Sequence, residues 1–239
     1  MPGPLILHIE TATDICSVAI SKGDQLISLV ESGPERSHAT LLNIFIRKAL
    51  EEGGVELRQM DAIAVSKGPG SYTGLRIGVS TAKGLAYGLE KPLLSSGTLE
   101  NMAYGARTDP SIGNLLKEHG KGLLLCPMLD ARRMEVFSCF FTSEIAVKRE
   151  VTADIVEGDS YGDILEKNHI CFFGNGADKC MEVLDHPHAH FVTGVNPSAS
   201  NMVRPVFNRF NREQFEDVAY FEPFYLKDFI ATTPRKKVL

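Results

Sequence analysis

The sequence has 239 residues, which at about 150 residues per domain corresponds to one large domain or two small ones. Hydrophobic residues make up 44% and charged residues 23%, a balance that is typical of soluble globular proteins and excludes wholesale disorder, collagen-like repeats and a coiled-coil rod. The net charge of -5 argues against a protein that binds nucleic acid along its whole surface, so any contact with RNA would be local or supplied by a partner.

Cysteine usage and hydropathy indicate the cellular compartment of the protein. The five cysteines are odd in number and form no C-x-x-C pair, which disfavours both a zinc ribbon and a disulfide framework and favours reduced thiols. No apolar run approaches the roughly 18 residues needed to span a bilayer, and residues 1–4 carry no basic segment that would begin a signal peptide. We therefore expect a cytoplasmic protein with no membrane contact.

The first half of the chain passes from strands to helices. Short apolar runs separated by turn residues predict an antiparallel meander of strands at residues 5–10, 15–21 and 25–31. Apolar residues then recur at helical spacing from Ser37, a candidate N-cap, to the stop signal of Gly53 and Gly54. A strand, a second helix and a further strand follow at residues 61–66, 73–89 and 92–96. This order predicts an α/β layer structure in which helices cover the sheet.

A polar stretch at residues 107–122 separates this unit from a second one that is rich in strands. The predicted strands of the second unit lie at residues 123–128, 135–142, 169–173 and 190–195. Helical character returns after Asn196, and we place the boundary between the units near residue 105.

The glycine-rich segment at residues 66–78 joins a predicted strand to a predicted helix. Such a loop can direct backbone N–H groups and the positive end of the helix dipole at an anion. However, Thr73 stands where the dinucleotide-binding pattern G-x-G-x-x-G needs glycine, and Gly74 is followed by Leu75 and Arg76 rather than by the Lys-Ser/Thr of a phosphate-binding P-loop. The alternative is a tight turn that sets the angle between strand and helix.

The following helix carries a stripe of small residues at intervals of four: Gly74, Gly78, Ala82 and Ala86. Gly84 and Gly88 form a second stripe. Each interior glycine costs about 0.5–1 kcal/mol relative to alanine, so a compensating gain is needed, and close approach of another backbone would supply it. That backbone could belong to the same chain or to another subunit.

Several segments together resemble one protein family. They are residues 5–13, 41–42, 68–78, 81–86, 130–137 and 223–226. Similar segments occur in the TsaB (YeaZ) family, and the matches extend from residue 5 to about residue 230. The string G-P-G-S-Y-T-G-L-R-I-G at residues 68–78 is the most specific, and D-A-R-R-M-E-V at residues 130–136 is less so.

The resemblance implies an α/β fold of two ribonuclease-H-like subdomains, of the actin, Hsp70 and sugar-kinase type. We expect residues 1–105 to form the first subdomain, rejoined by residues 206–239, and residues 106–205 to form a smaller second one. The β-β-β-α-β-α order of the first half agrees with this expectation independently.

The resemblance also implies a function. Members of the family act in forming threonylcarbamoyladenosine at position 37 of tRNA, as the non-catalytic partner of the homologous TsaD subunit, and the TsaE ATPase joins the complex. TsaB-like proteins often form homodimers when alone, and tRNA would be met through the complex. The expected interface lies on the two helices of the first subdomain, at Leu41, Phe45, Gly74, Arg76, Gly78, Ala82, Lys83 and Ala86. Replacing Gly78 by leucine would be the obvious test.

No catalytic residue, intrinsic cofactor or metal site is expected. In the first hairpin Glu10, Thr11 and Thr13 could be a remnant of a nucleotide site, but Ala12 stands where glycine would admit phosphate, so ATP or ADP is expected at most at the complex interface. Gly174-Asn175-Gly176 could be a second relic or a simple turn. The H-x-x-x-H metal motif of TsaD-like proteins is absent. The alternative functions are a nucleotide-dependent kinase or hydrolase, or an enzyme resembling a metallo-glycopeptidase.

Two polar clusters have alternative explanations. His186, His188 and His190 would share one face of a strand and could bind Zn²⁺ or Ni²⁺, but Pro187 interrupts the segment and favours an exposed loop. The charged residues Asp130, Arg132, Arg133 and Glu135 fit a solvated hairpin held by an ion pair, or a surface that contacts a partner or tRNA.

Overall fold

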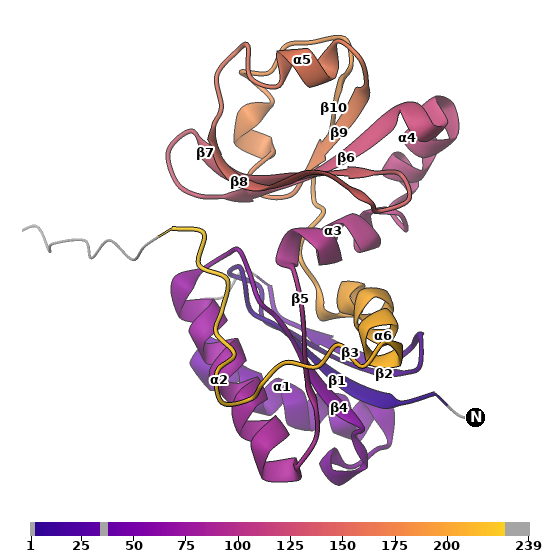
Figure 1. The fold of residues 1–239 in the computed structure, drawn as a ribbon, viewed down its shortest axis with the longest axis vertical. Coiled ribbons are helices and arrows are strands. Elements are labelled where there is room, and N and C mark those ends of the chain that lie inside the picture. The colour runs from indigo at the N-terminus through magenta and orange to yellow at the C-terminus, as the bar shows by residue number, and fades with distance from the viewer. Residues whose placement is uncertain (1–2, 34–37, 228–239) are drawn as a thin grey trace, which may run out of the picture.

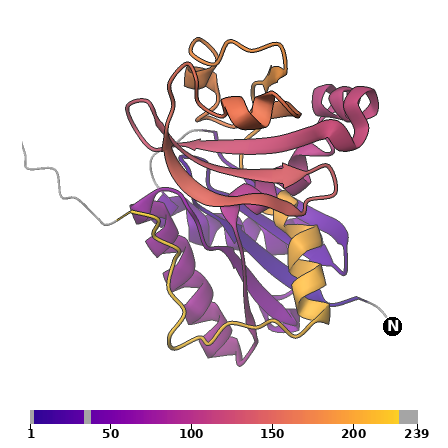
Figure 2. The same cartoon turned by 45° about the horizontal axis from the view of Figure 1, so that its top comes forward.

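The computed structural model describes residues 3–33 and 38–227, so Ser37 and the end of the chain lie outside the described residues. It contains two five-stranded sheets, each with helices packed against it, which confirms the expected two-subdomain α/β architecture (Figure 1). Figure 2 shows the two sheets as separate layers, one above the other.

The first sheet contains β1 (Leu5–Glu10), β2 (Ser17–Lys22), β3 (Gln25–Glu31), β4 (Ala62–Ser66) and β5 (Leu93–Ser96). The strand order is β3-β2-β1-β4-β5. β1, β2 and β3 are the antiparallel meander, whereas β4 and β5 run parallel to β1 and each other. All residues of β4 and β5 are buried, because helices cover both faces.

Two helices, α1 (His38–Gly53) and α2 (Tyr72–Leu89), pack on one face of this sheet, with the short helical turn η1 (Leu57–Gln59) between α1 and β4. The other face is covered by η4 (Ala199–Met202) and α6 (Val203–Asn211), through Met202 and Val206. The last part of the chain therefore returns to the first subdomain, and residues 212–227 then pass along the edge of the sheet to α2 (Figure 1).

The second sheet repeats the topology of the first. It contains β6 (Leu123–Asp130), β7 (Glu135–Thr142), β8 (Val147–Ile155), β9 (His169–Phe173) and β10 (Ala189–Val192), in the order β10-β9-β6-β7-β8. The meander of β6, β7 and β8 corresponds to β1, β2 and β3. The connecting helices are much shorter here: α5 (Gly162–Leu165) and η3 (Asp178–Cys180) stand where α1 and α2 stand in the first half.

Helices α3 (Thr98–Ala106) and α4 (Pro110–His119), with the turn η2 (Gly120–Gly122), connect the two sheets. The stretch at residues 107–122, expected as a polar separator, is therefore mostly helix. Asp109 caps α4 by accepting hydrogen bonds from Ser111 N at 2.8 Å and Ile112 N at 3.2 Å, and Pro110 suits the first helical position.

A polar cluster joins β7, β8 and Tyr161 in the second subdomain. The Asp154 carboxylate accepts two hydrogen bonds from the Arg149 guanidinium, at 2.8 and 2.6 Å, and others from Ser138 and Tyr161. Burial of Asp154 opposes its ionisation, but the hydrogen bonds from Arg149 and the two hydroxyls outweigh burial and lower its pKa.

We expect Asp154→Asn to lower the free energy of unfolding by about 2 kcal/mol, because a partly buried Arg149 loses its charged partner. Since folding lowers the pKa of Asp154, its contribution is complete above the unfolded value of about 4 and is lost as the pH falls through the folded value. Urea unfolding at pH 7 and at pH 3 measures both effects. The control is Glu51→Gln in the pair with Arg47, whose side chains are 70% and 73% exposed, and it should cost less than about 0.5 kcal/mol. Equal losses at pH 7 would contradict the assignment.

Candidate functional site

The glycine-rich loop packs directly on the first hairpin. A Cβ atom at Gly70 would lie 2.3 Å from the Ala12 carbonyl oxygen, so only glycine fits there. The Ser71 N–H donates to the same oxygen at 2.7 Å, and the Ser71 hydroxyl accepts from Gly74 N at 3.3 Å and caps α2. These contacts account for the loop as a tight turn that fixes the angle between β4 and α2.

The expected nucleotide remnant lies at the buried ends of the strands. Glu10 and Thr11 are fully buried, and the Thr11 hydroxyl donates to Gly74 O at 2.8 Å. Thr13 is partly buried, and its carbonyl oxygen lies 2.6 Å from Nε2 of His38. Neither Glu10 nor Thr11 therefore presents an accessible side chain to a nucleotide.

Glu10 belongs to a buried polar cluster at the carboxyl ends of β1, β4 and β5. Its Oε1 accepts hydrogen bonds from Ser66 Oγ at 2.6 Å and from Ala12 N at 2.7 Å. Burial raises the pKa of Glu10 despite these hydrogen bonds. Within the described residues, Glu10 Oε2, Ser96 Oγ and Thr98 Oγ1 have no hydrogen-bond partner. The cluster favours a protonated carboxyl group over an ionised catalytic one.

The first stripe of small residues on α2 faces the chain's own sheet. A Cβ atom at Gly74 would lie 2.1 Å from Thr11 O, and one at Gly78 would lie 2.2 Å from Thr11 Oγ1. Ala82 and Ala86 are also buried. Packing within the chain therefore accounts for these four residues, and in this structure they offer no surface to another protein.

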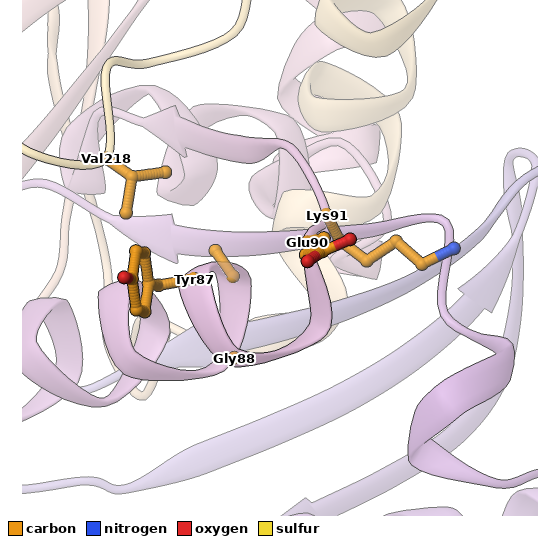
Figure 3. Close-up of a pocket in the computed structure, with 6 residues that line it drawn as sticks. Tyr87, Gly88, Glu90, Lys91 and Val218 are labelled. Atoms are coloured by element: carbon orange, nitrogen blue, oxygen red, sulfur yellow. The ribbon is translucent and has the colours of Figure 1, made fainter.

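The second stripe points the opposite way. Neither Gly84 nor Gly88 has a heavy atom within 4 Å of the position that a Cβ would take. The neighbouring Tyr87 is 81% exposed at the end of α2, where it lines a hollow with Gly88, Glu90 and Val218 (Figure 3).

Other expected interface residues differ in their placement. Leu41 and Phe45 on α1 are partly buried against the first core, and Ile44 beside them is 45% exposed. Arg76 donates to the Tyr72 hydroxyl at 3.3 Å, and its guanidinium lies over the Tyr72 ring. Lys83 is occupied within the chain, because its Nζ donates to Ala219 O at 3.1 Å and Phe221 O at 2.8 Å.

Lys83 thus holds the C-terminal segment against α2, a role that sequence reasoning missed. Two further contacts hold this segment. The Phe224 N–H donates to Lys67 O at 2.7 Å, and the ring centroids of Tyr72 and Tyr225 lie 4.9 Å apart. The sequence marked this segment only by the string at residues 223–226. That string has no periodic pattern, so it does not predict which element the segment packs against. The segment borders the exposed face of α2 on the side opposite α1.

The charged hairpin of the second subdomain is held by an ion pair. Lys179 Nζ donates to Asp130 Oδ1 at 2.5 Å and to the carbonyl oxygens of Arg133 and Glu135. Arg132 and Arg133 are exposed, with positive φ angles of 71° and 48°. Gly174 and Gly176 lie against the backbone of β6, where a Cβ atom would come within 2.4 and 2.7 Å of Met128 O and Leu129 C. These contacts favour a simple turn at residues 174–176 over a relic of a nucleotide site, and a solvated hairpin at residues 130–135 over a binding surface.

The histidines form neither the exposed loop favoured from the sequence nor the alternative group of His186, His188 and His190, because all three are partly buried and have different partners. His190 lies in β10, and its Nε2 is 3.0 Å from Nδ1 of His169 in β9. His186 instead accepts a hydrogen bond from His188 N at 3.1 Å. All five cysteines are buried, and burial raises the pKa of Cys16 to about 11, so the thiols lack thiolate character. Within residues 3–33 and 38–227, no helix is long and apolar enough to cross a bilayer.

The chain is similar in sequence to proteins of known families. Residues 32–166 match the family model described as TsaD, tRNA N6-adenosine threonylcarbamoyltransferase. The tRNA threonylcarbamoyladenosine biosynthesis protein TsaB of Escherichia coli is 41% identical over 42% of this chain and 43% of its own length. TsaB of Bacillus subtilis is 30% identical over 62% of this chain and 60% of its own length. The matched region therefore spans about half the length of these relatives.

Solved structures show the same fold over nearly the whole chain. YeaZ from Pseudomonas aeruginosa superimposes with a TM-score of 0.74 at 24% identity and covers 93% of this chain and 100% of its own. A second structure, of a Pseudomonas aeruginosa protein similar to YeaZ, gives a TM-score of 0.80 at 24% identity, over 94% and 100% of the two chains. The resemblance to the TsaB (YeaZ) family and the fold of two ribonuclease-H-like subdomains are both confirmed.

The two glycine stripes predict opposite effects of the same substitution. Gly78→Ala should lower the free energy of unfolding by about 1–3 kcal/mol, because the new methyl group overlaps Thr11 Oγ1. Gly84→Ala should raise it by about 0.5–1 kcal/mol, because its surroundings are open and alanine favours the helix. Urea unfolding of both variants measures the difference. A destabilised Gly84→Ala would show that Gly84 is packed against this chain.

Proposed function

The chain belongs to the family that the TsaD model describes, and from this premise we propose that it is a non-catalytic subunit of the machinery that forms threonylcarbamoyladenosine in tRNA. Its partner would be a TsaD subunit, which it stabilises or activates, with TsaE joining the complex. The TsaB relatives named for this biosynthesis support the pathway. The net charge of -5 supports a role in which tRNA is met through the complex.

The polar groups of the chain support a non-catalytic role. Glu10, which stands where phosphate-binding relatives of this fold need an accessible carboxylate, is fully buried and its pKa is raised. The H-x-x-x-H pair that would hold a metal in the first half is absent from the sequence. None of the five thiols is an accessible nucleophile, because all five are buried.

The docking surface we propose is an outer helix face, defined by Ile44 and Phe45 of α1 and Gly84, Tyr87 and Gly88 of α2. The observation that carries it is the open surroundings of Gly84 and Gly88. A glycine within a helix costs about 1 kcal/mol, and here nothing in the described part of the chain approaches it closely in return. A helix of a partner could pack there at short range, as small residues permit.

Apolar side chains of α1 and α2 fit the same use. Ile44 and Tyr87 are exposed, at 45% and 81%, and Phe45 is only partly buried. Aromatic and aliphatic groups of this kind supply most of the energy at protein interfaces. The same surface would mediate a homodimer when the chain is alone, so TsaD and a second copy would compete for it.

The outer helix face predicts the effect of a bulky charge. Gly84→Arg should leave the isolated chain folded, because the site is open, and should weaken association with TsaD at least about 30-fold, equal to about 2 kcal/mol. Co-expression followed by size-exclusion chromatography measures association, and a reconstituted tRNA modification assay measures the consequence.

The matched control is Gly113→Arg on α4, another helical glycine with nothing within 4 Å of its Cβ position. It should bind TsaD normally. If both arginine variants associate and support modification as the unaltered chain does, the outer helix face is not the interface. If tRNA modification is lost while association with TsaD is intact, Gly84 acts in a step that follows association, and the interface assignment is wrong.

The nucleotide-dependent kinase or hydrolase is tested by calorimetry with Mg-ATP. We expect no micromolar binding by the isolated chain, because Glu10 and Thr11 are buried and Gly70 closes on Ala12. Any ATP or ADP would bind only once TsaD completes the interface. Micromolar binding with turnover by the isolated chain would overturn the non-catalytic assignment.

A further inference from the structure

Three imidazoles meet at one edge of the second sheet, far from the outer helix face. His119 ends α4, His169 begins β9, and His190 lies in β10, which pairs in parallel with β9. The rings of His119 and His169 stack at 3.8 Å between centroids, and those of His119 and His190 lie at 5.1 Å. The group joins three elements that are separated by 50 and 21 residues in sequence (169 minus 119, 190 minus 169).

The ring nitrogens have the spacing of a metal site. One nitrogen from each histidine can be chosen so that all three lie within 4.8 Å of one another. Nδ1 of His169 and Nε2 of His190 are 3.0 Å apart. Tetrahedral Zn²⁺ with Zn–N bonds of about 2.0–2.1 Å separates its ligand nitrogens by about 3.3–3.4 Å. The rings of His119 and His169 are stacked with an angle of 12° between their planes, so they must turn out of the stack for their lone pairs to converge on one ion.

Nε2 of His119 is available to a cation, whereas Nδ1 of His169 and Nε2 of His190 share a hydrogen bond, so one of these two rings must change its tautomer before both can bind. Nε2 of His119 is buried and has no hydrogen-bond partner among the described residues, although its side chain as a whole is 13% exposed. Partial burial, followed by the neighbouring imidazoles, lowers the pKa of His169 and of His190. Neutral imidazole is the form that binds transition metals.

A stack of neutral histidines explains the ring contacts but leaves Nε2 of His119 unsatisfied, which is costly for a buried nitrogen. A bound cation satisfies it together with the other two nitrogens. The fourth position would fall to water or to the Glu118 carboxylate, whose Oε1 lies 3.8 Å from Nε2 of His119.

We propose that His119, His169 and His190 bind one Zn²⁺ ion or a similar borderline divalent cation. The ion fastens the end of α4 to the edge of the second sheet. This site differs from the one considered from the sequence, which grouped His186, His188 and His190, and it shares only His190 with that group. The proposal is independent of the proposed function, because none of the three residues lies on the outer helix face.

The experiment uses the full chain without a histidine tag, stripped with EDTA. Calorimetry with Zn²⁺ should give one ion per chain, and Co²⁺ should give the visible absorption bands of a tetrahedral site that Zn²⁺ then abolishes. Saturating Zn²⁺ should raise the melting temperature, because the ion binds the folded chain. His119→Gln and His190→Ala should each weaken Zn²⁺ binding at least about 100-fold, since each removes one of few ligands.

The control is His186→Ala, in the same segment as His190 but outside the cluster, and it should bind Zn²⁺ as the unaltered chain does. Circular dichroism establishes that each variant is folded. The proposal is overturned if the unaltered chain binds no Zn²⁺, or binds it no more tightly than a folded double variant of His119 and His190. It is equally overturned if His186→Ala removes the site while His119→Gln keeps it.

Discussion

The close approach of α2 to the first hairpin is the constraint on which the rest of the first subdomain depends. Gly70, Gly74 and Gly78 let the backbone of the loop and helix reach Ala12 and Thr11 at distances that no side chain permits. The Thr11 hydroxyl then donates to Gly74 O, and Ser71 N donates to Ala12 O, so the contact is also hydrogen-bonded. This packing fixes the rotation of α2 about its own axis. Because the stripe at Gly74 faces inward, the one at Gly84 must face outward.

The same contact supports the proposed non-catalytic role. The first hairpin and the glycine-rich loop are in direct contact at Ala12 and Gly70, which leaves no room for a phosphate group between these two residues. The carboxyl group of Glu10 is left buried among hydroxyls, where its raised pKa favours the neutral form. The C-terminal segment completes the arrangement from outside, since Lys83 holds it along α2 through two backbone carbonyls. On the last turns of α2, Gly84, Tyr87 and Gly88 remain exposed.

Periodic segments were predictable from the sequence, and isolated contacts were not. The meander, α1, β4 and α2 follow from regular apolar spacing. β8 was missed because most of its residues are only partly buried, and α4 was missed because Ile112 is its one buried side chain. The glycine spacing predicted that a backbone comes close, but local chemistry cannot tell whether that backbone belongs to the same chain. Thr11, 63 residues away from Gly74, supplied the answer. His119 and His169 are likewise distant in sequence from His190.

The duplication of the sheet shows how the two halves differ in structure. In the first half, the long helices α1 and α2 cover one face of the sheet, and their outer sides remain exposed. In the second half, α5 and η3 have only 4 and 3 residues, so the edge strand β10 stays partly exposed along its whole length. This edge strand is held by its pairing with β9 and by Phe191 and Val192, which pack against the apolar cores of the second subdomain. The three imidazoles add a polar contact between α4, β9 and β10 at this edge, where no long helix covers the strand.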